Sequence, residues 1–436
     1  HGKPTVTAAP ATSATATRTR HWVLLLGFLL SAVTYLDRVC ISAAAPSMTR
    51  DLGLTSMQMG YVFSVFPLAY AIFEVPSGWL GDRLGQRSVL TRIVACWSVF
   101  TMLTGVAWNY AVLVATRFVF GAAEAGAFPT LSRGLARWFP QGERAAANGV
   151  MWMGARTGGA IAPAIAALLI ARIGWRATFA LFGSVGFLWC AVFWRWYRDD
   201  PGDHPSVNAA ELARIREGAA QPARDGVARG NAPWGRILSS GTMWALFGMY
   251  SCSAYGFWFF VTWLPTFLIR EHGLSLERSG IYSSLPLAVG ALGCLAGGAL
   301  SDFLVRRTGN VKWARRAIGI GGFAVAAIGF AAAASVHSGL IAVLCLALAG
   351  GSNDMTIPVA WATVVDVGGR FGGTTSAFMN MASSLSAMLS PVSAVWLAAR
   401  FGSFSAMLAV AAGVYVIGAL LWLGVDPTAT ALDTAQ

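Results

Sequence analysis

Charged side chains fall inside long apolar stretches of this 436-residue sequence, among them Asp37, Arg38, Arg117, Glu124 and Arg156. An ionisable group at the centre of a bilayer costs roughly 2.5–3.5 kcal/mol, so each of them should face protein or water. The planar guanidinium of arginine suits a carboxylate, which it holds with two hydrogen bonds. A carboxyl in a dry site near arginines can take up or release a proton when its surroundings change. Together these residue types predict a site for an anion and a proton.

The spacing of these residues decides which of them can act together. Asp37 and Arg38 are adjacent, so on a helix they point about 100° apart and cannot face one partner. Arg117 and Glu124 are seven residues apart, on one helix face and roughly 10 Å apart along the axis. Each set also has a purely structural alternative. Asp37 and Arg38 could form a local charge pair that only braces helix packing, and Arg117 could extend to the nearby membrane surface.

Further polar positions carry alternatives of their own. Arg156 is flanked by three glycines, which would admit a ligand or a close helix. Asn353 and Asp354 lie in another apolar stretch. Three roles stay open for Asp354: an ion pair with Arg156, a second protonation site, or the binding of a cationic group of a ligand. Glu74 lies two turns before a polar loop, where a gating role and a proton-handling role are both open.

The composition places these residues in a membrane protein. The sequence is 56% hydrophobic and 11% charged, with a mean hydropathy of +0.60, whereas soluble domains carry about 25% charged residues. The net charge of +12 does not indicate nucleic-acid binding, because the basic residues lie in short loops rather than on one polar face.

The six cysteines lie in apolar runs without CxxC spacing, and the histidines are scattered. No metal site, cofactor or enzyme active site is therefore predicted.

Twelve apolar runs account for most of the chain, and each can cross about 30 Å of hydrocarbon as a helix. They are 22–46, 56–80, 88–108, 111–136, 145–171, 175–197, 241–269, 279–300, 315–336, 338–365, 372–398 and 404–425. Basic residues concentrate in the loops after every second run, so by the positive-inside rule both termini and the 198–240 loop are cytoplasmic. We predict an all-α membrane protein of twelve transmembrane helices. Its parts are a disordered cytoplasmic tail (1–21), an N-terminal six-helix bundle (22–197), a cytoplasmic linker (198–240), a C-terminal six-helix bundle (241–426) and a cytoplasmic tail (427–436).

The two halves repeat one motif. Gly78-Trp-Leu-Gly-Asp82-Arg83-Leu-Gly-Gln-Arg87 follows the second run, and Gly298-Ala-Leu-Ser-Asp302 opens the matching stretch after the eighth run. A parallel six-plus-six repeat is the architecture of a rocking transporter, with its site between the halves at mid-membrane. The charged members of the motif, Asp82, Arg83, Arg87 and Asp302, are assigned to a gate. There, ion pairs between the halves would hold one conformation and break in the other.

The 78–87 stretch resembles the signature loop of the major facilitator superfamily, and the resemblance extends from about Trp22 to Asp426. Further stretches resemble its anion:cation symporter family, which includes hexuronate, galactonate and glucarate permeases and sialin. These stretches are Tyr35-Leu-Asp37-Arg38, Gly121-Ala-Ala-Glu124-Ala-Gly-Ala-Phe-Pro129, Arg137-Trp-Phe-Pro140, Trp263-Leu-Pro265 and Asn380 to Pro391. The resemblance implies proton-coupled symport of a small organic anion.

The resemblance also implies roles for single residues. Glu124 would be the proton-coupling residue, Asp37 and Arg38 would handle proton and substrate, and Arg117 would bind the anion. Arg156 and Asp354 depart from the family pattern, which carries a polar uncharged residue near position 156. The resulting assignment is substrate binding for Tyr35, Arg38, Tyr70, Arg117, Arg156, Asn353 and Asn380, proton coupling for Asp37, Glu124 and Asp354, and gating for Glu74, Asp82, Arg83, Arg87 and Asp302.

The expected setting is the bacterial inner membrane, where the protein acts as a monomer. Its expected partners are the lipid bilayer, a small organic anion and protons, with sodium left open as the coupling ion. The alternative function is a proton-coupled antiporter that exports a drug-like or cationic solute. The three intramembrane arginines argue against it, because they repel cations. The run from Gly154 to Pro163 also lacks the Gly-Pro repeats usual in antiporters.

Overall fold

The computed structural model describes residues 15–217, 232–274, 276–401 and 405–428, and these residues are helical with no strand among them. The predicted tails and linker therefore lie partly outside the described residues. The helices are α1 (Thr19–Leu52), α2 (Ser56–Leu84), α3 (Gln86–Gly105), α4 (Tyr110–Glu124), α5 (Ala127–Trp138), α6 (Arg144–Trp196), α7 (Ala209–Ile215), α8 (Trp234–Ser239), α9 (Gly241–Thr262), α10 (Leu264–His272), α11 (Leu276–Thr308), α12 (Val311–Ser335), α13 (Gly339–Gly368), α14 (Gly372–Phe401) and α15 (Ser405–Trp422). Three 3-10 turns join them: η1 (Gln141–Glu143), η2 (Pro201–Asp203) and η3 (Gly369–Phe371).

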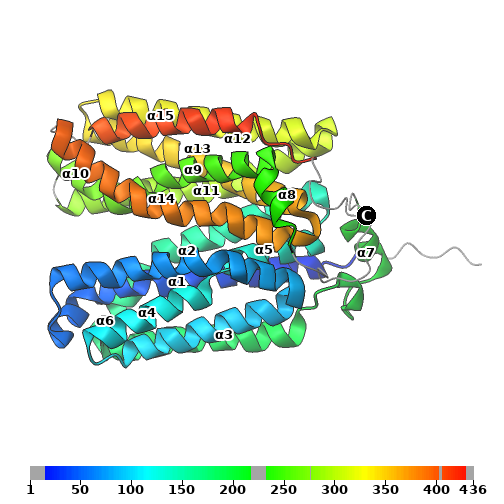
Figure 1. Ribbon diagram of the computed structural model, residues 1–436, viewed down its shortest axis with the longest axis horizontal. Helices are drawn as coiled ribbons and strands as arrows, with labels where there is room; N and C mark the ends of the chain where they lie inside the picture. Colours follow the sequence, from blue (N-terminus) through cyan, green and yellow to red (C-terminus); the bar gives the residue numbers. More distant parts are fainter. Residues whose placement is uncertain (1–14, 218–231, 275, 402–404, 429–436) are drawn as a thin grey trace, which may run out of the picture.

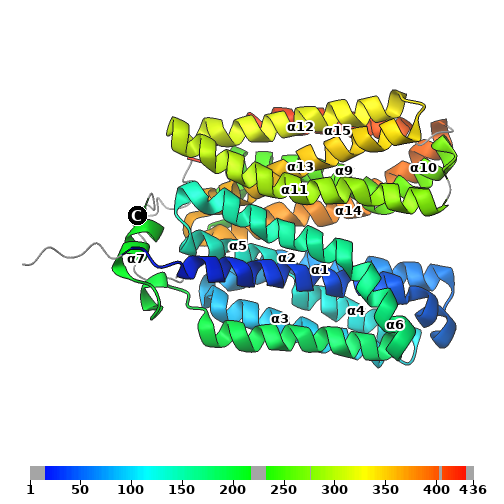
Figure 2. The ribbon, with the colours of Figure 1, turned by 180° about the vertical axis from the view of Figure 1, so that it is seen from behind.

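The long helices lie side by side in two bundles, as Figures 1 and 2 show from opposite sides. In the first bundle α1 and α3 pack on α6, and α2 packs on α4. In the second, α13 packs between α11 and α12, and α14 packs on α9. The short helices α7 and α8 lie at one end of the bundles, which we call the linker end (Figure 1). The predicted all-α fold of two helical bundles is confirmed.

The helix boundaries follow glycines at positive φ. The predicted run 111–136 is divided into α4 and α5 at Gly126, where φ is 83° and a Cβ would lie 2.4 Å from Cβ of Ser77. The runs 145–171 and 175–197 both belong to α6, which turns at Gly174 with φ 77°. A positive φ strains any residue with a side chain, so glycine is required at such breaks. Within the described residues, nine stretches are long and apolar enough to cross a membrane, and Gly339–Ser390 joins two predicted runs.

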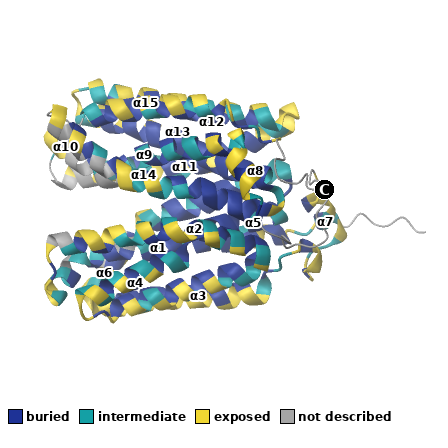
Figure 3. Ribbon diagram, in the orientation of Figure 1, coloured by how far each residue is buried: buried dark blue, intermediate teal, exposed yellow. Residues whose placement is uncertain are grey.

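The outer surface of the bundles is apolar. Large aliphatic side chains such as Leu188, Leu292 and Ile328 are about two-thirds exposed there. Figure 3 shows buried residues concentrated between the helices and exposed residues on the outward faces of α3, α12 and α15. A soluble protein rarely exposes so much contiguous apolar surface. The surface therefore fits a lipid environment, as expected for a multi-pass membrane protein.

Glycines of the repeated motif bring the two bundles together near the linker end. A Cβ on Gly78 of α2 would lie 2.5 Å from the carbonyl oxygen of Gly373, and one on Gly298 of α11 would lie 2.4 Å from that of Ala145. Both distances are far below any normal contact, so only glycine permits this approach. The repeat places α2 against α14 and α11 against α6, and these are the main contacts between the bundles.

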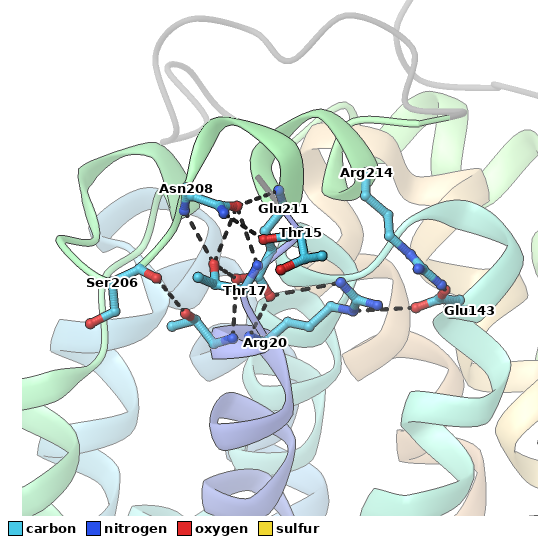
Figure 4. A network of polar contacts seen from close by, with 9 residues as sticks. Thr15, Thr17, Arg20, Glu143, Ser206, Asn208, Glu211 and Arg214 are labelled. Carbon is cyan, nitrogen blue, oxygen red and sulfur yellow. Dashed lines mark hydrogen bonds and ion pairs between the residues drawn. The ribbon is translucent and has the colours of Figure 1, made fainter. Parts of the chain in front are cut away.

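The linker helix α7 is tied to the start of α1, as Figure 4 shows. Glu211 accepts hydrogen bonds from the backbone N–H groups of Thr19 (3.1 Å) and Arg20 (3.1 Å) and from the hydroxyl of Thr17 (2.6 Å). These bonds satisfy N–H groups that a helix start leaves unpaired. Residues 15–21, predicted to belong to a disordered tail, are therefore ordered, because the linker supplies a carboxylate cap that is remote in the sequence.

Candidate functional site

Arg38 of α1 and Glu124 of α4 form an ion pair inside the first bundle. Nε of Arg38 lies 2.5 Å from Oε1 of Glu124, whose side chain is fully buried. Aromatic rings surround the guanidinium: its Cζ lies 4.8 Å from the centre of the Tyr70 ring and 5.3 Å from that of Tyr35. Cationic groups over aromatic faces are stabilised by the negative face of the ring. The structure thus brings together four of the predicted site residues.

This ion pair leaves hydrogen-bonding capacity unused. Nη2 of Arg38, the hydroxyl of Tyr70 and Oε2 of Glu124 are buried and have no hydrogen-bond partner among the described residues. Buried polar groups in proteins are nearly always paired, so unpaired ones mark functional positions. Two of the three are donors, which suits an anionic ligand.

Asp37 of α1 and Arg117 of α4 are two further buried charged residues of the first bundle. Both are almost completely buried, and the charge of Arg117 acts on Asp37 and on Glu124. Arg117 also lies over Phe120, with its Cζ 4.2 Å from the ring centre. Its burial rules out the alternative in which it extends to the membrane surface. Asp37 and its neighbour Arg38 both interact with Glu124, Asp37 through its charge and Arg38 through the ion pair.

Arg156 of α6 and Asp354 of α13 join the two bundles. Nε and Nη2 of Arg156 donate to the two carboxylate oxygens at 2.8 and 3.0 Å, and both side chains are buried. The amide of Asn353 also donates to Asp354 (3.1 Å) and accepts from the hydroxyl of Ser253 (2.7 Å). Of the three alternatives for Asp354, the structure contains the pairing with Arg156. Asn353, assigned to substrate binding, here orients the carboxylate.

Glu74 of α2 and Asn380 of α14 form a second link between the bundles. The amide nitrogen of Asn380 donates to Oε1 of Glu74, and both side chains are buried. The two residues were assigned to different roles, gating and substrate binding. Their direct contact ties α2 to α14, and moving one bundle away from the other would break this hydrogen bond.

The aspartates of the repeated motif bind helix starts in the opposite bundle. Asp82 at the end of α2 accepts from the backbone N–H groups of Gly373 (2.9 Å) and Thr374 (2.7 Å) and from the Thr374 hydroxyl (2.8 Å). Asp302 in α11 accepts from the backbone N–H of Ala146 in α6 (2.6 Å). A carboxylate at a helix N-terminus is stabilised by the unpaired N–H groups and by the helix dipole. Both contacts hold the bundles together near the linker end.

Arg83 and Arg87, also assigned to the gate, do not reach across the bundles. Cζ of Arg83 lies 4.5 Å from the ring centre of Trp79, and Cζ of Arg87 lies 4.4 Å from the ring centre of Trp194. The guanidinium of Arg87 also donates to the carbonyl oxygen of Trp194. The prediction that these arginines form ion pairs between the halves is therefore wrong for this conformation. Tryptophan faces within the first bundle hold them, and backbone N–H groups take their expected place beside the aspartates.

Asp366 of α13 forms ion pairs that link the two bundles and that the sequence analysis did not predict. It is buried between Arg144 of α6, which donates to Oδ1, and Arg315 of α12, whose Nη2 lies 2.7 Å from Oδ2. Both arginines were counted only as basic loop residues. The sequence did contain a signal for this contact. Asp366 directly follows the run 338–365, and Arg144 and Arg315 lie at the starts of the runs 145–171 and 315–336.

An aromatic layer lies between the charged residues and the linker end. The rings of Phe128 and Trp152 stack with centres 4.7 Å apart, and Trp361 lies 5.5 Å from Trp152. Trp152 is one turn nearer than Arg156 to the linker end of α6, and Tyr35 has the same relation to Arg38 in α1. The layer therefore separates the ion pairs from the contacts of Asp82 and Asp302.

Comparison with known proteins agrees with this arrangement. Residues 27–391 match the family model of the Major Facilitator Superfamily. The chain is 35% identical to a probable sulfoacetate transporter of Cupriavidus necator, over 95% of each protein. It is 31% identical to a probable galactarate/D-glucarate transporter of Escherichia coli, over 94% of this chain and 91% of that protein. The solved proton:xylose symporter XylE is similar in fold, with a TM-score of 0.75 at 16% identity, covering 94% of this chain and 96% of that one. These relatives are membrane transporters rather than enzymes, the resemblance to the anion:cation symporters is confirmed, and the chain belongs to the major facilitator superfamily.

Proposed function

We propose that the protein is a proton-coupled symporter of a small organic anion that works by alternating access. The observation that carries this proposal is the buried Arg38–Glu124 pair with its unpaired donors, Nη2 of Arg38 and the hydroxyl of Tyr70. The relatives named above, a probable sulfoacetate transporter and a probable galactarate/D-glucarate transporter, support an anionic substrate.

The coupling follows from competition for one guanidinium. While Glu124 is ionised it occupies Arg38, so an incoming anion meets a neutralised arginine. When Glu124 takes up a proton its hold on Arg38 weakens, and the anion replaces it. Leaving a charge unpaired in a buried site costs several kcal/mol, so proton and anion bind more favourably together than apart. This mutual reinforcement is what symport requires.

The contacts of Asp82, Asp302 and Asp366 suit a state in which the linker end is closed. By the positive-inside rule that end is cytoplasmic, so this state would take up anion and protons from the opposite side. Alternating access then requires these contacts to break while contacts at the far end form. We place the protein in the bacterial inner membrane as a monomer with both termini in the cytoplasm.

The test is transport by purified protein in liposomes with sulfoacetate and galactarate as probes. Glu124→Gln mimics the protonated carboxyl, so it should support anion exchange across the membrane but not accumulation driven by a pH gradient. Glu217→Gln makes the same chemical change on an exposed linker residue and should behave as wild type. Accumulation by Glu124→Gln on a proton gradient would remove Glu124 as the coupling residue. Uptake that follows a sodium gradient alone, or efflux of cations, would refute proton symport.

A further inference from the structure

Two arginines from different helices lie over the same stacked pair of rings. Cζ of Arg38 in α1 is 5.7 Å from the centre of the Phe128 ring, and Cζ of Arg156 in α6 is 5.9 Å from that of Trp152. Phe128 and Trp152 stack almost parallel, with an interplanar angle of 6°. Both guanidinium groups therefore border the same ring stack.

Tyr35 lies between the two arginines. Its ring centre is 5.3 Å from Cζ of Arg38, and its hydroxyl group interacts electrostatically with Arg156. Gly159, one turn after Arg156 on the same face of α6, lies against this ring, where a Cβ would be 3.2 Å from Cδ1 of Tyr35. Both arginines thus border one region, and a short molecule lying along Tyr35 would reach both.

Each arginine is occupied by a buried carboxylate from another helix. Glu124 of α4 holds Arg38 and Asp354 of α13 holds Arg156, at 2.5 and 2.8 Å. The two pairs are alike in composition, but the first lies within one bundle and the second joins both. A ligand with one acidic group would displace one carboxylate, and a ligand with two acidic groups would displace both.

We propose that the substrate is a short dianion, with one acidic group on Arg38 and the other on Arg156, and that two protons enter with it. This proposal rests on the proposed symport function. Each acidic group replaces one carboxylate, Glu124 or Asp354, and each displaced carboxylate binds one proton from the solution. The two negative charges of the ligand balance the two added protons, so the loaded site has the same net charge as the empty one.

The other charged groups near Glu124 do not change this balance. Arg117 and Asp37 face Glu124 from α4 and α1 and offset each other, and the hydroxyl of Tyr70 faces it from α2. Glu74, also on α2, interacts with Glu124 but is hydrogen-bonded to Asn380 in the second bundle.

The surroundings of Asp354 are neutral apart from Arg156. Asn353 donates to it, and Cys294 of α11 and Tyr415 of α15 are the other titratable groups that interact with it. A Cβ on Gly290 would lie 2.3 Å from its Oδ2, so α11 packs directly on the carboxylate. Once a ligand displaces Asp354 from Arg156, no second cation among the described residues pairs with it, and protonation is the available neutral state.

The experiment uses wild-type protein in liposomes with two matched pairs of anions. Galactarate is compared with galactonate, and sulfoacetate with isethionate, because in each pair one carboxylate is replaced by a hydroxymethyl group. Uptake should be at least about tenfold higher for the dianion of the preferred pair, since 1.4 kcal/mol corresponds to tenfold. The balance point of opposing proton and dianion gradients should give two protons per dianion, and a potassium–valinomycin potential should not shift it.

Variants of the second pair test its role separately. Asp354→Asn keeps the shape but not the charge, so dianion uptake should couple to one proton and become sensitive to membrane potential. The double variant Arg156→Gln with Asp354→Asn replaces one buried ion pair by a neutral pair, and it should lose the dianion preference while still taking up the monoanion. The control removes an exposed ion pair, Asp51→Asn with Arg176→Gln, and should leave stoichiometry and preference unchanged.

Three results would overturn the inference: equal uptake of monoanion and dianion by wild type, a proton-to-dianion ratio other than two, or an unchanged dianion preference in the Arg156/Asp354 double variant. Each of these still includes proton-driven anion uptake, so the proposed function would stand. Absence of proton-driven uptake for all four probes would refute the proposed function and this inference with it.

Discussion

Changing Asp82 to Asn should open the linker end of the protein. Oδ1 of Asp82 accepts from the backbone N–H of Gly373, and Oδ2 accepts from the backbone N–H and hydroxyl of Thr374. An asparagine keeps only one accepting oxygen. In either orientation its amide N–H₂ faces a backbone N–H, so at least one hydrogen bond is lost and a donor meets a donor.

The magnitude follows from these contacts. A hydrogen bond to a charged group contributes about 1.5–3 kcal/mol, and the charge at the helix N-terminus adds about 0.3–1 kcal/mol. Allowing for the bonds that a neutral carbonyl can keep, Asp82→Asn should destabilise the closed linker end by about 2–4 kcal/mol. At 1.4 kcal/mol per tenfold, the open population rises roughly 30- to 700-fold. Asp302→Asn should have a smaller effect, because its one described hydrogen bond is to Ala146.

Distances between two spin labels measure this population. Labels at Gln141 in η1 and Arg307 in α11, with the six native cysteines replaced, report the separation of the bundles at the linker end. We expect a longer-distance population that grows from wild type to Asp302→Asn, then Asp82→Asn, and is largest in the double variant, since distant contacts add. Asp51→Asn is the exposed control. A distance distribution unchanged in the double variant, or a larger effect for Asp302→Asn than for Asp82→Asn, would refute the reasoning.

Three other predictions concern single contacts. Arg117→Lys keeps the charge but loses the planar guanidinium, so anion affinity should fall in a thermal-shift titration, and an unchanged affinity would separate Arg117 from the site. Glu211→Gln removes the charged cap of α1. Hydrogen bonds from Thr17, Arg20 and Thr19 lower the pKa of Glu211, so we expect the free energy of unfolding to fall by about 0.5–2 kcal/mol in thermal unfolding, and no loss would contradict the capping role. The hydrogen bond from Lys312 lowers the pKa of Asp426 to about 2, a depressed value, so this pair stabilises above pH 4 and the contribution is lost as the pH falls towards 2. Lys312→Met should therefore lower the free energy of unfolding at pH 7 by at most about 1 kcal/mol, because the pair is partly exposed. The measurement is thermal unfolding at both pH values, and a difference from wild type that persists at pH 2 would contradict this assignment.

The local sequence determined the features that depend on residue type and spacing. The twelve apolar runs indicated the membrane helices, because a bilayer requires about twenty apolar residues per span. The repeated Gly78 and Gly298 stretches indicated two related halves. The scarcity of charges within these runs marked Glu124, Arg38 and Arg156 as candidates, since intramembrane charges are costly. Each of these signals lies within one continuous stretch of about ten to twenty residues.

Only the tertiary structure decided which charged groups meet. Arg38 pairs with Glu124 across 86 positions and Arg156 with Asp354 across 198, and neither distance has a local signal. Asp82 was assigned to ion pairs between the halves, but its ion pair, with Arg133 at 3.8 Å, lies within the first bundle. Across the bundles it binds backbone N–H groups of α14, which every residue except proline possesses and no sequence pattern marks. The same holds for Asp366, whose two arginines looked like ordinary basic loop residues. A partner is chosen by how helices pack, and packing depends on the close approach of many side chains at once.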